Sequence, residues 1–184
     1  MPDIEITPAT YANVSYDNDD IRRVVTTLLE QAGLEVPVRI HVDESTPLSK
    51  VKTTSLDPLV LAVESGALED TRRPRQFGEV EAADSLGRQV FKAADRMNPS
   101  FGAPPLGEEI PLPHSVAWDT YVAGRLARSG HRAQRQRRVY NFELRHGFTD
   151  AALAAFDTLW SADELTWPEI VAISDEARAA LEAA

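Results

Sequence analysis

The sequence predicts an α+β fold, with a small sheet and an N-terminal helix followed by a mainly helical second half. Two early segments carry strand patterns, at 36–42 and 59–63, and from residue 78 onward the apolar residues recur at helical spacing. The 184 residues are 43% hydrophobic and 26% charged, which is ordinary usage for a globular protein. This composition excludes a disordered or collagen-like chain.

The first half of the chain contains a helix over 19–33 and the two strands. Asp17 offers a capping oxygen at the start of that helix, and Gly33 is a natural stop at its end. Alternation predicts a half-buried strand over 36–42, whereas the continuous apolar run over 59–63 predicts a more central strand. The polar stretch between the strands carries no predicted element. We expect one apolar core that contains Leu28, Ile40, Leu61 and Val90.

The second half begins with a long helix over 78–97. The loop over 98–113 follows and holds five prolines, so we expect it to cover a pocket or to mark a subdomain boundary. Further helices are predicted over 114–129, from 131 to about 145, after Thr149, as a short turn over 162–165, and over 167–182. Capping-box spacing supports the last two, from Ser161 to Glu164 and from Thr166 to Glu169. We interpret 1–130 as the α+β core and 131–184 as a helical C-terminal extension packed on it.

Several classes of function lack the residues they need. The chain has no cysteine, which excludes disulfides, zinc–thiolate sites, iron–sulfur clusters and thiol nucleophiles. It also has no phosphate-binding glycine loop, dinucleotide fingerprint or Gly-flanked serine elbow. No leader pattern or membrane-length apolar run is present, so we expect a soluble, cytoplasmic protein without a cofactor.

Arginines are concentrated in one part of an acidic chain. The net charge is −10, yet residues 119–147 contain seven arginines and only two acidic side chains. This segment could bind an anion, a phosphorylated ligand or nucleic acid, or it could pair with acids of the same chain; we favour pairing. Because the chain as a whole repels nucleic acid, that partner is not expected. The candidate anion-binding residues are Arg128, Arg132, Arg135, Arg138 and Arg145.

The histidines give no predicted catalytic or metal site. No two of the four have the spacing of metal ligands on one helix face. His41 lies on the polar side of a strand, which favours a solvated or structural role. His146 precedes a helix-stop glycine, where a cation is favourable. His114, Trp118 and Tyr121 are candidates for lining a pocket.

Two stretches of helical pattern resemble those of a known scaffold. Residues 85–96 look like the active-site helix of a minimal zincin metallopeptidase, and residues 117–125 look like the later helix that brings the third ligand. The resemblance implies a helix-and-sheet core before the active-site helix. The HExxH pair of the family is absent, with Gly87, Arg88 and Val90-Phe91 in its place. It therefore implies an inactive scaffold without zinc, because the histidine ligands and the catalytic base are missing.

Three functions follow from these observations. The first is a non-enzymatic interaction or scaffold module, which is a degenerate hydrolase fold if the resemblance holds, working through contacts with another protein or with itself. The second is a binder of an anionic or phosphorylated ligand, or of nucleic acid, through residues 125–145. The third is a metal-independent enzyme whose groups converge only in three dimensions. We favour the first over an enzyme.

Overall fold

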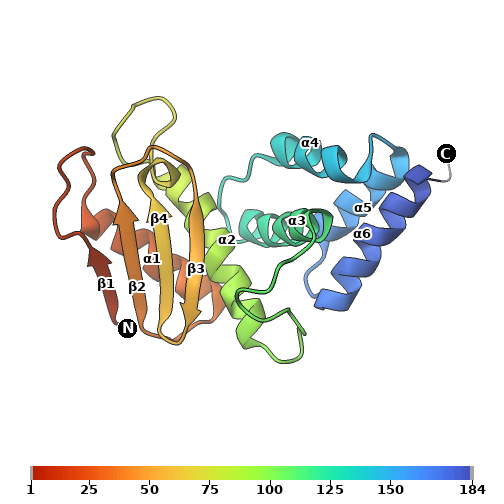
Figure 1. The fold of residues 1–184 in the computed structure, drawn as a ribbon, viewed down its shortest axis with the longest axis horizontal. Coiled ribbons are helices and arrows are strands. Elements are labelled where there is room, and N and C mark those ends of the chain that lie inside the picture. Colours follow the sequence, from red (N-terminus) through yellow and green to blue (C-terminus); the bar gives the residue numbers. More distant parts are fainter. Residues whose placement is uncertain (1, 183–184) are drawn as a thin grey trace. The chain divides into compact units, whose positions relative to one another are not determined.

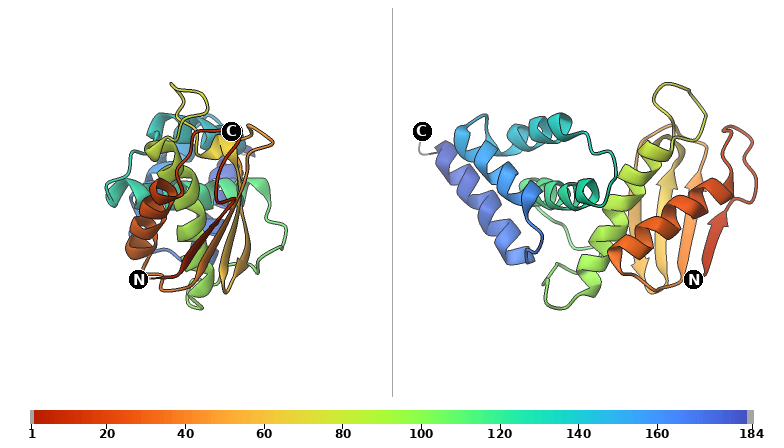
Figure 2. Two further views of the ribbon diagram at one scale, coloured as in Figure 1. Left: turned by 90° about the vertical axis from the view of Figure 1, so that its left-hand side faces the viewer. Right: turned by 180° about the vertical axis from the view of Figure 1, so that it is seen from behind.

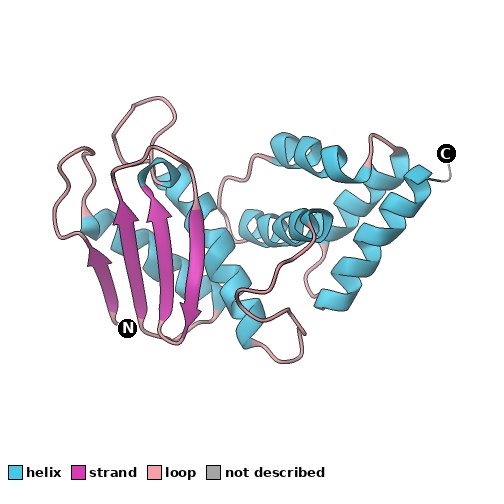
Figure 3. Ribbon diagram, in the orientation of Figure 1, coloured by secondary structure: helices cyan, strands magenta, loops and turns pink. Residues whose placement is uncertain are grey.

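The computed structural model describes residues 2–182, which form two compact units that divide after Met97. Among these residues there are four strands and six α-helices, so the molecule has the predicted α+β class (Figure 3). No described helix is both long enough and apolar enough to cross a membrane. Each unit is described by itself.

The first unit is built around a mixed four-stranded sheet (Figure 1). The strand order is β1-β2-β4-β3; the first three of these run parallel, and β3 pairs antiparallel with β4 at the edge. In chain order the elements are β1 (Ile4–Thr7), α1 (Asn18–Ala32), β2 (Val38–Asp43), β3 (Val51–Leu56), β4 (Leu59–Glu64), a short 3-10 turn (Ser65–Ala67) and α2 (Glu79–Met97).

Both helices of this unit cover the same face of the sheet and leave the other face open (Figure 2). Strand β2 alternates buried and exposed residues along its whole length, which is the period expected of a sheet covered on one side. The predicted core is confirmed, because Leu28, Ile40, Leu61 and Val90 are all fully buried.

The sequence pattern predicts no strand in the polar stretch between the two predicted strands, yet the edge strand β3 forms there. Its covered face includes Thr53, whose buried hydroxyl donates a hydrogen bond to the side chain of Gln89 at 3.1 Å. Lys52 and Thr54 are exposed on either side of it. With a polar residue facing inward, the strand has no apolar alternation for a sequence pattern to detect.

The regular elements described in the second unit are all helices. It contains α3 (Leu112–Arg128), α4 (Arg135–His146), α5 (Asp150–Ser161) and α6 (Trp167–Glu182). Helix α3 packs against the other three, so it belongs with the residues that follow it. The structure thus draws the boundary between units at residue 97, whereas the sequence interpretation drew it at residue 130.

Two capping signals near the start of α6 have different outcomes. The backbone N–H and hydroxyl of Thr166 both donate to the carboxylate of Glu169 at 2.7 Å, so the half of the capping box in which Glu169 reaches back to Thr166 forms. The predicted helical turn over 162–165 is wrong, because these residues are not helical. Instead of capping that turn, the hydroxyl of Ser161 donates back to the Asp157 carbonyl inside α5 at 2.6 Å.

The loop before α3 is anchored rather than loose. Phe101 is buried and stacks on Trp118, with ring centroids 5.6 Å apart. Its carbonyl accepts a hydrogen bond from the backbone N–H of Trp167 at 2.7 Å. One aromatic side chain therefore holds the proline-rich segment against the helices of the second unit.

Candidate functional site

Two of the five candidate anion-binding arginines are paired within the second unit. The guanidinium of Arg128 lies 3.2 Å from the Asp163 carboxylate and donates to the carbonyls of Trp160 and Ala162 at the end of α5. Arg135 pairs with the Asp157 carboxylate. Pairing with acids of the same chain, the interpretation that we favoured, therefore holds for both.

The other three candidates differ from one another. Arg138 is partly buried and takes part in contacts of its own. Arg132 and Arg145 are exposed and form no ion pair with the side chains that the structure describes, and the same holds for Arg137. The segment is therefore not one continuous array of free cations.

Four exposed apolar side chains gather beside α4. Tyr140 is 56% and Phe148 63% exposed, and their ring centroids lie 6.0 Å apart. Leu144 is about half exposed and lies one helical turn after Tyr140, on the same outward face. Leu181 is also about half exposed and lies close to Gly147, where an added Cβ would come within 2.9 Å of its methyl groups.

The exposed arginines border this cluster. Arg137 is three residues before Tyr140 and Arg145 follows Leu144, which places both on or beside the outward face of the helix. The opposite face carries Phe142, which is fully buried. We call the set formed by Arg137, Tyr140, Leu144, Arg145, Phe148 and Leu181 the α4 surface.

Of the α4 surface, the residues predicted from the sequence include Arg145 but none of the four apolar side chains. Its four apolar members are scattered over α4, the following loop and α6, so no single periodic stripe contains them. The available signal was Tyr140 and Leu144 lying outward, opposite the stripe formed by Val139, Phe142 and His146. An apolar pair opposite the buried stripe of a helix indicates a second contact face.

His146 is a buried, neutral hydrogen-bonding residue. Its Nδ1 lies 2.9 Å from the Phe142 carbonyl, which can only accept, so Nδ1 carries the proton. Nε2 therefore accepts from the Ser174 hydroxyl at 2.7 Å. Burial, the largest cause, lowers the pKa of His146. The interpretation of this residue as a cation at the end of a helix is wrong.

The three predicted pocket-lining residues lie in an aromatic cluster of the second unit. Trp118 and Tyr121 are buried, and Trp118 also contacts Trp167, with ring centroids 5.2 Å apart. His114 is partly exposed, and its Nε2 lies 2.7 Å from the Asp175 carboxylate. That these residues line a pocket stays a prediction.

Neither a metal site nor a known relative identifies the protein. Among residues 2–182, no group of three or more histidine or acidic side chains is placed to hold a metal ion. Comparison with known proteins finds no matching family, no similar curated protein and no similar solved structure. The resemblance to a minimal zincin scaffold stays a prediction.

Proposed function

We propose that this protein is a non-enzymatic interaction module that docks an acidic amphipathic helix of another protein on the α4 surface. The observation that carries the proposal is the cluster of four exposed apolar side chains bordered by Arg137 and Arg145, two exposed arginines that form no ion pair with a described side chain.

The composition of the α4 surface supports a protein partner. Aromatic residues and arginine are enriched in protein interfaces, whereas single exposed apolar residues are ordinary on any surface. Here Tyr140, Phe148 and Leu144 occur together with guanidinium groups at their border. A helix presents apolar residues at matching spacing when it packs across such a face.

The charges of the surface support an acidic partner. Arg128 and Arg135 are already paired with Asp163 and Asp157. Fewer of their N–H donors are therefore free for the carboxylates of a partner. Arg137 and Arg145 are exposed and have no such acid among the described side chains, so their guanidinium groups can donate to a carboxylate from a partner. Acidic residues flanking an apolar stripe are the complementary pattern.

Two other partners for the α4 surface have less support. Single-stranded nucleic acid could stack on Tyr140 and Phe148, but Leu144 and Leu181 add apolar area that bases do not need, and the net charge of −10 opposes it. A second copy of this chain could cover the same apolar area. Both are distinct outcomes of the test below.

The test uses a labelled synthetic helix of about four turns, with leucine and phenylalanine on one face and glutamate on the other. A control peptide carries lysine in place of every glutamate. Because a chain of net charge −10 attracts the lysine peptide non-specifically, preference for the acidic peptide reports the local surface. Fluorescence anisotropy with the full chain should show binding at least about tenfold tighter for the acidic peptide.

Variants assign the binding to the surface. Leu144→Ser and Phe148→Ser should each weaken binding of the acidic peptide by about tenfold, because the few interface residues that dominate affinity each cost more than about 1 kcal/mol when truncated. Leu48→Ser is the matched control, because Leu48 is 61% exposed but belongs to the first unit. Equal or tighter binding of the lysine peptide would overturn the proposal. So would salt-sensitive binding of polyuridylate that competes with the peptide, or a dimer that dissociates only in the Leu144 and Phe148 variants.

A further inference from the structure

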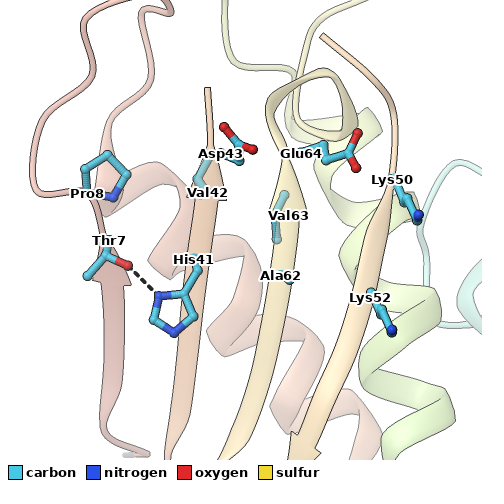
Figure 4. A pocket seen from close by; sticks show the side chains of 10 residues that line it. All are labelled: Thr7, Pro8, His41, Val42, Asp43, Lys50, Lys52, Ala62, Val63 and Glu64. Atoms are coloured by element: carbon cyan, nitrogen blue, oxygen red, sulfur yellow. Dashed lines mark hydrogen bonds between the residues drawn. The ribbon is translucent and has the colours of Figure 1, made fainter. Parts of the chain in front are cut away.

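A hollow of about 510 Å³ lies on the open face of the sheet in the first unit (Figure 4). It is found towards the carboxyl ends of the parallel strands β1, β2 and β4, where open sheets commonly bind ligands. Its volume is within the range of about 300–1,000 Å³ that small-molecule sites occupy. The hollow belongs to the first unit, whereas the α4 surface belongs to the second.

The floor of the hollow exists because one residue is small. Strand register places Thr7, His41, Ala62 and Lys52 in one row across all four strands. The methyl group of Ala62 leaves space between the longer side chains that flank it. The Thr7 hydroxyl lies 2.7 Å from Nδ1 of His41, and this contact fixes the ring along one side.

One wall of the hollow is cationic. Lys50 and Lys52, two of the three lysines in the chain, project from the edge strand or directly before it. Both are exposed, and neither forms an ion pair with a side chain that the structure describes. Their ammonium groups are available to an anion.

The adjoining wall is acidic. Asp43 and Glu64 are partners in the register of the two central parallel strands. One oxygen of Asp43 already accepts from Ser45, at 2.6 Å from its hydroxyl. Oε2 of Glu64 is buried and accepts no hydrogen bond from any residue within 2–182. Glu64 and Asp43 both line the hollow, so the two carboxylates together present negative charge to a ligand there.

We propose that this hollow binds a small zwitterion of the amino-acid class. Its carboxylate lies between Lys50 and Lys52, and its ammonium group donates to Glu64 beside Asp43. His41 and Thr7 bound the ligand on the β1 side, and Ala62 lies beneath it.

Charge on both walls is what selects a zwitterion. A ligand with only an anionic group would bring its charge near Asp43 and Glu64, and like charges at short range disfavour binding. A ligand with only a cationic group would bring its charge near Lys50 and Lys52, and this repulsion would likewise disfavour binding.

The experiment titrates the full chain and follows backbone amide resonances by NMR. The probes are β-alanine, γ-aminobutyrate and ε-aminocaproate, which place the two charges at increasing separation. Butyrate and butylammonium are the single-charge controls. At least one zwitterion should saturate the shifts of His41 and Ala62, with affinity at least about tenfold above both controls.

Substitutions locate the binding. Lys52→Gln and Glu64→Gln should each weaken the best zwitterion by about tenfold, since each removes one charge-assisted hydrogen bond. Ala62→Leu should abolish binding by filling the floor. Val60→Leu is the matched control, because Val60 is on the same strand two residues earlier and does not line the hollow. The unbound spectra of the variants verify their fold.

Three results would overturn the proposal. The first is the absence of saturable shifts with all three zwitterions, and the second is butyrate or butylammonium binding as tightly as they do. The third is binding that survives Lys52→Gln and Glu64→Gln unchanged. None of these results bears on the α4 surface.

Discussion

His146 illustrates how burial decides the role of a single residue. Its ring stacks on Phe142, with centroids 3.8 Å apart, and both nitrogens are hydrogen-bonded inside the second unit. The ionisable groups that act on its pKa electrostatically are Arg178, His114 and Asp175. Among these only Asp175 favours the protonated ring, and burial outweighs it.

This environment predicts a pH dependence of stability. Burial lowers the pKa of His146 below the ordinary value of 6.5. Between the lowered pKa and 6.5 the unfolded chain binds more protons, so the contribution to the free energy of unfolding is complete above pH 6.5 and is lost as pH falls through this window. Urea unfolding at about pH 7.5 and about pH 5.5 should show lower stability at the acidic value.

Tryptophan fluorescence is the readout of choice, because all three tryptophans belong to the second unit. The double variant His146→Phe with Ser174→Ala is the control, since it removes the titrating group together with its partner. An unchanged dependence on pH in this variant would assign the effect to other groups.

The same pair predicts a non-additive response to substitution. His146→Phe alone leaves the buried Ser174 hydroxyl without its acceptor and should cost about 1–3 kcal/mol. Adding Ser174→Ala should recover part of this loss, because a pair replaced by apolar groups leaves no unsatisfied atom. A double-mutant cycle measured by urea unfolding checks this, and additive losses would contradict it.

At the scale of elements, Gly124 sets the distance between α3 and α5. A Cβ built on Gly124 would lie 2.0 Å from the Trp160 carbonyl oxygen. Helix propensity alone favours alanine over glycine by about 1 kcal/mol. We expect Gly124→Ala to lower the free energy of unfolding instead, by about 2 kcal/mol or more, because backbone must move. A stabilised variant in thermal unfolding would contradict this packing.

The packing of α1 and α2 on the sheet predicts how much stability is lost when a core leucine is truncated. Leu28→Ala and Leu61→Ala each open a cavity at a fully buried position and should cost about 2–5 kcal/mol. Leu48→Ala, at an exposed position, should cost less than about 0.5 kcal/mol. Circular dichroism is the appropriate probe, since the first unit has no tryptophan. Losses below about 1 kcal/mol at both buried leucines would contradict the core.

Elements with regular periodicity could be predicted from the sequence. Helix α1 begins after Asp17, whose side chain accepts from the Asp19 N–H, and it ends at Gly33 in the left-handed conformation, as its capping residues indicate. Strand β3 could not be predicted, because its inward residue Thr53 is satisfied by a hydrogen bond to another element. Local pattern carries no information about such a partner.

At the scale of the whole molecule, the net charge does not show which charged side chains form ion pairs. Residues 98–184 carry eight arginines and twelve acidic residues, so composition alone indicates an acidic unit. The sequence identified the arginine segment, but which arginines are neutralised depends on the acids near the end of α5. Contacts between elements therefore decide which of the predicted arginines can still pair with a partner.

The zwitterion hollow shows the same limit of prediction. Thr7, His41 and Lys52 come from three separate segments, and only strand register brings them into one row. The sequence predicts a solvated or structural role for His41, and this residue is exposed on the open face of the sheet, as a solvated residue is. Its neighbours could not be predicted without β3.

The most direct test of the docking function is the footprint of the acidic amphipathic peptide on the full chain, measured from amide chemical shifts. We predict that the shifted resonances lie within α4, around Phe148 and near Leu181, and that raising salt weakens the interaction as Arg137 and Arg145 are screened. A footprint centred on Arg128 and Arg135, or one confined to residues 2–97, would contradict the account.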